Sequence, residues 1–148
     1  MKIFLLAFLL FPLCSFKHAT VNNADAIIGK WMSEENNLEV EVFKSGSEYK
    51  ARVIWFDDTD DKSRPMAERY DLKNSDKALQ SRKIIGLEVM YGLTYNEDAD
   101  EWQDGHIYDS STGKEWNAKI WLTKAGVLKV RGYWHISLFG QTMLFKKV

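Results

Sequence analysis

The chain has 148 residues, of which 45% are hydrophobic and 28% are charged, and its formal net charge at pH 7 is −1. This length fits a single domain. The mean hydropathy of −0.35 excludes a polytopic membrane protein, and the apolar content is too high for a disordered chain. The balanced charge argues against nucleic-acid binding, which needs an excess of Lys and Arg.

The first residues are typical of a signal peptide. A positively charged start, Met1-Lys2, precedes an apolar stretch over residues 3–13 that is shorter than a membrane span. We therefore expect residues 1–19 to be a signal peptide, with a cleavage point left open between residues 15 and 26. The expected single domain covers residues 27–148 and is exported, either to the periplasm or as a secreted protein.

The cysteine and aromatic contents describe the mature domain further. The one cysteine, Cys14, lies in the leader, and the preceding Leu13 does not suit lipid attachment there. A mature domain without cysteine has no disulfide, no thiol catalysis and no cysteine-based zinc site. All six Trp and all six Tyr lie beyond the leader, so the domain is rich in large aromatic side chains.

Apolar and polar residues alternate through most of the mature chain with a period of two, which predicts β-strands. Short segments rich in Gly, Ser, Asn and Asp separate these runs and favour tight turns. The eight predicted strands cover residues 27–34, 38–42, 49–55, 84–95, 101–109, 114–123, 127–135 and 141–148.

Eight consecutive strands joined by short turns predict an all-β fold, an antiparallel up-and-down β-barrel, because closing the sheet removes its exposed edges. One long connection, from about residue 57 to 83, interrupts the pattern, and residues 75–81 within it favour a short helical turn. The interior of an eight-stranded barrel can be filled by side chains or can hold one small ligand.

Aromatic residues recur on the apolar faces of the predicted strands, as with Tyr49 and Trp55 on either side of Ala51 and Val53. We expect such residues to line the interior and to contact a small hydrophobic or amphipathic ligand. The same side chains would equally fill the barrel, so a lined cavity and a packed interior both remain open. The predicted lining residues are Tyr49, Trp55, Tyr91, Trp116 and Trp134.

Other apolar residues interrupt the polar faces of the strands. They either pack under the long connection or form a surface for a protein partner in the cell envelope. A partner surface would give the protein an alternative function, as a structural or interaction domain with a filled barrel. The residues concerned are Ile54, Phe56, Trp121, Tyr133 and the Leu138-Phe139 tip.

No set of residues in the sequence predicts an enzyme. His106 lies near Asp104 and Asp109, but a histidine on a strand face beside an aspartate is the simpler interpretation. Nothing spaces three ligands for zinc or iron. The acidic run Asp57–Asp61 lacks the glycine of an EF-hand loop, so a solvated acidic loop is favoured over a calcium site. We expect no cofactor and no metal site.

The segment Gly29-Lys30-Trp31, together with Arg131 on a late strand, resembles the lipocalin and calycin pattern. In that pattern a tryptophan closes one end of the barrel beneath an arginine. The resemblance implies that Trp31 and Arg131 form a cation–π stack that plugs the barrel end.

A second resemblance covers nearly the whole mature chain, and it is to the bacterial DUF2147 family. Members of that family are exported, calycin-like and without an established reaction, so the resemblance implies a fold and a compartment but no activity. The motifs that carry it are Asp71-Leu-Lys-Asn74-Ser-Asp76, Leu79-Gln-Ser81-Arg82, Gly86-Leu87, Gly105-His-Ile107-Tyr108-Asp109, Gly113-Lys114, Leu128-Lys-Val130-Arg131-Gly132-Tyr133 and Leu138-Phe139-Gly140-Gln-Thr142.

The most motif-like part of the long connection contains Asn74, Asp76 and Arg82. Asn and Asp side chains commonly cap turns, and an arginine can hold a loop to a barrel through a carboxylate such as Asp71 or Asp109. Loops also carry binding residues more often than the elements they connect. A structural clamp and a ligand site therefore both remain open for this stretch.

Overall fold

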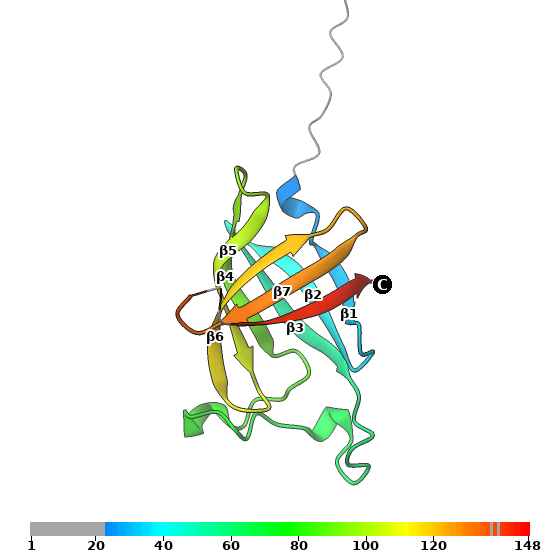
Figure 1. The fold of residues 1–148 in the computed structure, drawn as a ribbon. Coiled ribbons are helices and arrows are strands. Elements are labelled where there is room, and N and C mark those ends of the chain that lie inside the picture. Colours follow the sequence, from blue (N-terminus) through cyan, green and yellow to red (C-terminus); the bar gives the residue numbers. More distant parts are fainter. Residues whose placement is uncertain (1–22, 137, 139) are drawn as a thin grey trace, which may run out of the picture.

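The computed structural model describes residues 23–136, 138 and 140–148, and it shows a closed barrel of eight antiparallel strands in chain order (Figure 1). Each strand pairs with the next, and the first pairs with the last. The predicted fold class is therefore confirmed. The strands are β1 (Gly29–Ser33), β2 (Leu38–Ser45), β3 (Glu48–Phe56), β4 (Glu88–Asn96), β5 (Glu101–Asp109), β6 (Lys114–Leu122), β7 (Val127–Tyr133) and β8 (Gly140–Lys147).

The start of β4 differs most from the sequence-based expectation, because the strand begins at Glu88 and not at residue 84. Residues 84–87 form a turn in which Gly86 adopts a φ of 85°. The amide N–H of Ile84 donates to the carbonyl of Arg69, across the long connection. The sequence pattern does not distinguish an apolar residue that packs against a loop from one that lies in a strand, so it placed the start of β4 too early.

Three short 3-10 turns complete the secondary structure: η1 (Asn23–Asp25), η2 (Met66–Glu68) and η3 (Lys77–Leu79). The predicted helical stretch at residues 75–81 is η3, a single turn, whose first residue follows Asp76. The Asp76 carboxylate accepts a hydrogen bond from the Ala78 N–H, as expected for an N-cap. None of the helices in the described part of the chain is long and apolar enough to cross a membrane.

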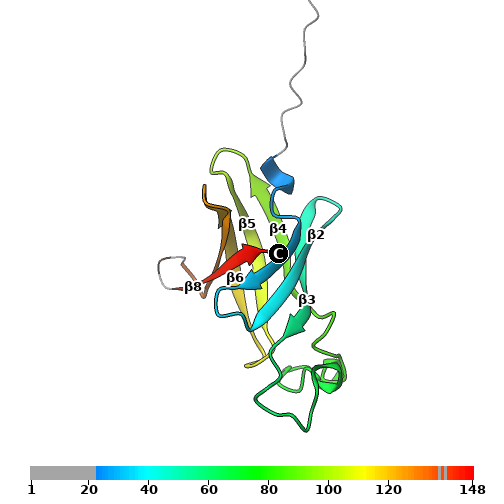
Figure 2. The ribbon, with the colours of Figure 1, turned by 90° about the vertical axis from the view of Figure 1, so that its right-hand side faces the viewer.

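Alternating strand directions give the barrel two different ends. The turns β2–β3, β4–β5 and β6–β7 lie at the end that η1 covers, which we call the closed end. The turns β1–β2, β5–β6 and β7–β8 lie at the other end with residues 57–87, and we call this the loop end. The long connection, in green, runs across the bottom of the barrel in Figure 1 and extends to one side of it in Figure 2.

Aromatic residues close the barrel at the end covered by η1. The buried indoles of Trp31 and Trp102 donate to the carbonyls of Ile27 and Ala24 at 2.8 and 2.9 Å. Tyr49 packs edge-on against Trp102, with ring centroids 6.3 Å apart. A buried indole N–H needs an acceptor, and here the N-terminal segment supplies it. Several aromatic residues of the barrel therefore form a plug.

Bulges change which face of a strand its residues occupy. In β3, Val53 pairs with Val40 and Trp55 pairs with Glu39, so Ile54 is an extra residue on one side of the ladder. Beyond such a residue the alternation shifts by one position. Phe56 therefore faces the barrel interior at the loop end, where strict alternation would have placed Trp55.

Candidate ligand cavity

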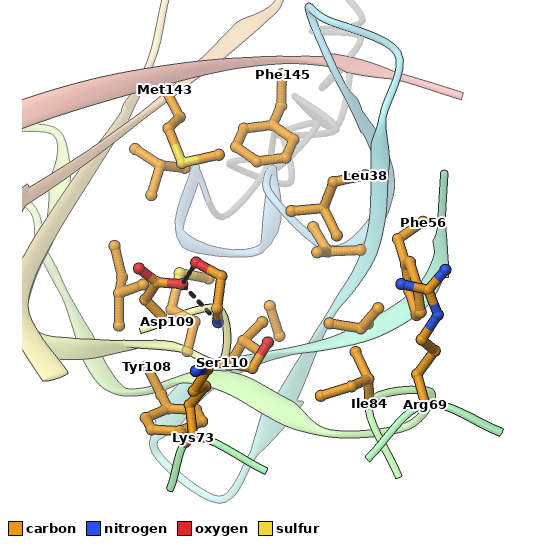
Figure 3. A pocket seen from close by; sticks show the side chains of 18 of the residues that line it. Leu38, Phe56, Arg69, Lys73, Ile84, Tyr108, Asp109, Ser110, Met143 and Phe145 are labelled. Carbon is orange, nitrogen blue, oxygen red and sulfur yellow. Dashed lines mark hydrogen bonds between the residues drawn. The ribbon is translucent and has the colours of Figure 1, made fainter. Parts of the chain in front are cut away.

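A cavity of about 630 Å³ occupies the barrel interior on the side of the loop end (Figure 3). Its volume lies within the range of about 300–1,000 Å³ that small-molecule sites occupy. The walls come from six strands and are mainly aliphatic. The wall residues are Val40, Val42, Ala51, Val53, Met90, Ile107, Leu128, Val130 and Phe145.

The rim of the cavity is marked by apolar residues that both line it and reach solvent. Tyr70 and Leu72 of the long connection are 43% and 58% exposed, and Met143 of β8 is 42% exposed. The deeper wall residues, such as Leu128 at 1% and Ala51 at 2%, are buried. The cavity therefore runs from a closed apolar interior to an opening at the loop end.

Arg69 organises the acidic run beside the rim. Its guanidinium donates to the Asp60 carboxylate at 2.8 Å and to the carbonyls of Asp58 and Asp61, and it lies 6.0 Å from the Phe56 ring centroid. The hydrogen bond from Arg69 lowers the pKa of Asp60. The acidic run, expected to be a solvated loop, is largely exposed, and Arg69 contacts three of its residues.

Asp109 lies on the cavity wall and caps the β5–β6 turn. Its carboxylate accepts from the N–H and the hydroxyl of Ser111, at 2.9 and 2.6 Å, and from the Thr112 hydroxyl at 2.7 Å. Burial raises the pKa of Asp109, but these hydrogen bonds together outweigh burial and hold the pKa below its ordinary value. Arg82, for which Asp109 was one predicted partner, pairs instead with Asp71.

Asp71 is at the centre of a buried polar group that we call the Asp71 cluster: Asp71, Asn74, Arg82 and Tyr108. The Asp71 carboxylate is fully buried and accepts from the Tyr108 hydroxyl at 2.6 Å, from Arg82 Nη2 at 2.8 Å and from Asn74 Nδ2 at 2.9 Å. The Asn74 side-chain oxygen accepts from the Asp76 N–H. Because Tyr108 belongs to β5, the cluster fastens the long connection to the barrel, which is the geometry of a clamp.

Two groups of the cluster, the Asp71 carboxyl and the Tyr108 hydroxyl, have shifted pKa values. Burial raises the pKa of Asp71, but the hydrogen bonds from Tyr108, Arg82 and Asn74 outweigh it, so the pKa lies below its ordinary value. Burial and the neighbouring Asp71 carboxylate raise the pKa of Tyr108 to about 12. The cluster therefore holds an ionised carboxylate and a neutral phenol at neutral pH.

None of the five aromatic residues predicted to contact a ligand belongs to the cavity lining. Tyr49 lies in the closed-end plug, and its hydroxyl donates to Asp25 at 2.6 Å. Trp55 lies next to the β3 bulge, which turns Phe56 toward the cavity in its place. Tyr49 is buried in the interior, but at the closed end and away from the cavity. Alternation alone cannot locate the bulge beyond which Trp55 and Phe56 exchange faces.

The other three predicted lining residues also lie outside the cavity. Tyr91 stacks on His106 with ring centroids 5.5 Å apart, and its hydroxyl bonds to Glu115. Gly92, with a φ of 72°, follows Tyr91, and a bulge-like shift at this point separates Tyr91 from the buried Leu93. Trp116 and Trp134 pack edge-to-face at 5.6 Å, and Trp134 is 55% exposed.

The predicted barrel-end plug is present at Trp31 but with a different cation. Lys147 Nζ lies 5.5 Å from the centroid of the Trp31 ring. Arg131 instead donates from Nη1 to the Thr142 hydroxyl and from Nη2 to the Leu138 carbonyl. The pairing of β1 with β8 brings Lys147 opposite Trp31, a neighbour relation that only strand register decides.

The sequence interpretation did not single out the rim residues of the long connection. Asp71 and Asn74 turn inward to the cluster, while Leu72 and Lys73 between them line the cavity. The Asp71–Asn74 motif marks this stretch in the sequence, but only the fold decides which of its residues face the cavity. No group of three or more His, Cys, Asp or Glu side chains suited to a metal ion occurs among the described residues.

A closed eight-stranded antiparallel barrel with an apolar cavity at one end is a lipocalin-like fold. Among solved structures, the chain is similar to one described as "Protein HP1028 from the human pathogen Helicobacter pylori belongs to the lipocalin family". The similarity covers 82% of each chain at 19% sequence identity and a TM-score of 0.69, and at this identity it supports the fold alone.

The sequence itself matches a bacterial family described as "Uncharacterized protein conserved in bacteria (DUF2147)" over residues 29–147. The chain belongs to this family, as its motifs indicated. No curated protein matches the chain.

Proposed function

We propose that this protein binds a small hydrophobic or amphipathic molecule inside its barrel. The observation that carries the proposal is the cavity of about 630 Å³, whose deep walls are aliphatic and whose rim reaches solvent. Burying apolar surface of a ligand there would contribute about 25 cal/mol for each Å² removed from water. The closed-end plug gives the cavity a floor, so a ligand would enter and leave at the loop end.

The proposed setting is outside the cytoplasm, in the periplasm or the extracellular medium. Its support is the leader pattern of residues 1–19, which lie outside the described part of the chain. A barrel that shields an apolar molecule from water suits transport between membranes or storage in an aqueous compartment.

The test is a variant that fills the cavity. Val130 lies on the cavity wall and is 8% exposed, so Val130→Phe places a ring in the space that the ligand would use. Val127→Phe on the same strand, outside the lining, is the matched control. Delipidated protein would be titrated with fatty acids and with the neutral fluorescent probe N-phenyl-1-naphthylamine, and examined by native mass spectrometry.

We expect binding by the natural sequence and by Val127→Phe, and its loss in Val130→Phe with an unchanged circular dichroism spectrum. If Val130→Phe still binds the ligand, the binding site lies outside this cavity. No binding of any apolar molecule by the natural sequence would contradict the proposal.

A second candidate function is docking to a protein of the cell envelope. The observation in its favour is the β7–β8 connection, where Trp134, Ile136 and Leu138 are 55%, 57% and 76% exposed. Of the surface predicted from the sequence, Phe56 lines the cavity and Phe139 lies outside the described residues. Ile54, Trp121 and Tyr133 are half-buried.

Cross-linking in intact envelopes tests this second function. The natural sequence would capture a defined partner, and Leu138→Glu would lose it because a charge replaces an apolar side chain that is 76% exposed. Identical cross-linking patterns for both proteins would exclude docking through this surface.

A further inference from the structure

We infer that the ligand of the cavity is a single-chain amphipath with an anionic head group, held tail-inward, with Lys73 and Arg64 binding the head at the rim. The inference rests on the proposed function and adds the charge and orientation of the ligand. Both cationic residues belong to the long connection and line the cavity.

The acidic side chains at the rim already have hydrogen-bond donors. Asp60 accepts two hydrogen bonds from Arg69, at 2.8 and 3.2 Å. Asp109 accepts from Ser111 and Thr112 within its own turn. A cationic head group would have to compete with these donors, two of which are hydroxyls fixed by the turn itself. The acids of the lining are therefore part of the loop structure.

The two inferred head-group residues, in contrast, have free donor capacity. Lys73 is exposed, and its ammonium group makes no ion pair or hydrogen bond with any residue that the structure describes. Arg64 bonds to Asp61 through Nε at 2.7 Å, which leaves both of its Nη groups without a partner within the same described ranges. A carboxylate or phosphate accepts from ammonium and guanidinium groups in strong, charge-assisted hydrogen bonds.

The backbone of Lys73 is fixed, which lowers the entropy cost of using its side chain. The next residue in the chain, Asn74, belongs to the Asp71 cluster. The Lys73 carbonyl lies close to Gly113, where an added Cβ would be 1.9 Å from the Lys73 oxygen. Figure 3 shows Lys73 beside Tyr108 and Ser110, on the side of the cavity away from the buried Phe145.

The deep part of the cavity sets the orientation of the ligand. Its wall residues, among them Val42, Ala51 and Leu128, carry no hydrogen-bonding side chains. An ionised head group placed there would lose its hydration without compensation. The apolar chain therefore occupies the interior, and the charged end stays at the rim, where water, Lys73 and Arg64 can reach it.

The experiment compares ligands that share one chain and differ only in the head. Laurate, dodecyl phosphate, dodecanol and dodecyltrimethylammonium would each displace N-phenyl-1-naphthylamine from the delipidated mature protein, below their critical micelle concentrations. We expect both anions to bind more tightly than the alcohol and the cation to bind most weakly. The two anions distinguish a carboxylate from a phosphate head.

Charge-removing variants assign the head group to the rim. Lys73→Gln and Arg64→Gln should each weaken laurate binding by about three- to fivefold, as expected for a partly exposed ion pair, and leave dodecanol binding unchanged. Lys77→Gln and Lys62→Gln are matched controls, because both lysines are exposed in the same long connection and neither lines the cavity.

Three results would contradict the inference while leaving the proposed function intact: equal affinity for laurate and dodecanol, tightest binding of the cation, or an unchanged laurate-to-dodecanol ratio in both charge-removing variants. A failure of all four ligands and of the neutral probe to bind would instead overturn the proposed function itself.

Discussion

A fully buried carboxylate, Asp71, illustrates how single residues determine the shape of the cavity rim. An isolated buried charge costs several kcal/mol, but Asp71 receives hydrogen bonds from Tyr108, Arg82 and Asn74. Oδ2 accepts from both Arg82 and Asn74, whereas Oδ1 accepts from Tyr108, so removing the Tyr108 hydroxyl would leave a buried ionised oxygen without this partner. The cluster therefore makes the position of the long connection depend on a few specific side chains.

Tyr108→Phe tests this dependence with a change of one hydroxyl. We expect it to lower the free energy of unfolding by about 1–3 kcal/mol, because the Asp71 oxygen loses a partner that water cannot replace in a buried site. The control is Tyr91→Phe, which also removes a hydroxyl bonded to a carboxylate, but that carboxylate, Glu115, is exposed whereas Asp71 is buried. Urea denaturation that gives equal losses for both variants would contradict the role of burial.

The lowered pKa of Asp71 predicts how stability depends on pH. Since the folded-state pKa lies below the unfolded value of about 3.8, the ionised carboxylate stabilises the fold above that value. This contribution is lost as the pH falls through the folded-state pKa. The difference in unfolding free energy between the natural sequence and Asp71→Asn should therefore be constant above about pH 5 and shrink below about pH 4. A difference that stays constant down to pH 2, measured by denaturant titration, would argue against this assignment.

At the scale of elements, the long connection is the segment that shapes the loop end of the barrel. It covers the loop end and supplies Leu72 and Lys73 to the rim. Besides the Asp71 cluster, it is held by direct backbone contact with the β5–β6 turn at Gly113. Gly113 has a φ of 72°, so this position favours glycine both for its backbone conformation and for the space that it leaves.

Gly113→Ala is expected to destabilise the protein more than Gly126→Ala does. Both glycines have a positive φ, of 72° and 77°, so alanine costs about 1–2 kcal/mol at either site. At Gly126 nothing lies within 4 Å of an added Cβ, whereas at Gly113 the Lys73 carbonyl must move as well. Thermal unfolding should show the larger loss for Gly113→Ala, and proteolysis of the long connection should become faster. Equal losses of stability in the two variants would mean that the long connection moves away from the added methyl group without cost.

The strands show what alternation can and cannot predict. All eight were predicted from their alternating apolar and polar residues, although β8 in the structure has one buried residue, Phe145. The bulge at Ile54 and the shift near Gly92 were not, because they depend on how two strands pair. Each moved an aromatic side chain away from its predicted place, Trp55 in β3 and Tyr91 in β4.

At the scale of the whole molecule, closure of the barrel depends on the pairing of β1 with β8. This pairing joins three residues on each strand, against seven for β7 with β8. Two further backbone hydrogen bonds cross beside it, from Glu34 N–H to the Leu144 carbonyl and from Val148 N–H to the Lys30 carbonyl. Together with β3–β4, which also joins three residues on each strand, the β1–β8 contact is therefore one of the two shortest strand pairings of the barrel.

Native-state hydrogen exchange followed by NMR tests this expectation. The amides of Glu34 and Val148 should exchange faster than the interior amides of the β7–β8 pair, because local opening at the short contact breaks fewer bonds. Addition of a ligand that fills the cavity should slow exchange on both sides of β8. Uniform protection around the barrel would contradict a weak β1–β8 contact.

The sequence by itself determined the fold class, the number of strands and the family, because strand alternation, turn residues and local motifs are properties of neighbouring positions. It also suggested that Arg82 pairs with Asp71, although Asp109 was equally eligible. Only the tertiary structure decided that aromatics plug the closed end while aliphatic residues line a cavity at the loop end. That division depends on bulges, strand register and the path of a long connection, which arise from contacts between residues far apart in the chain.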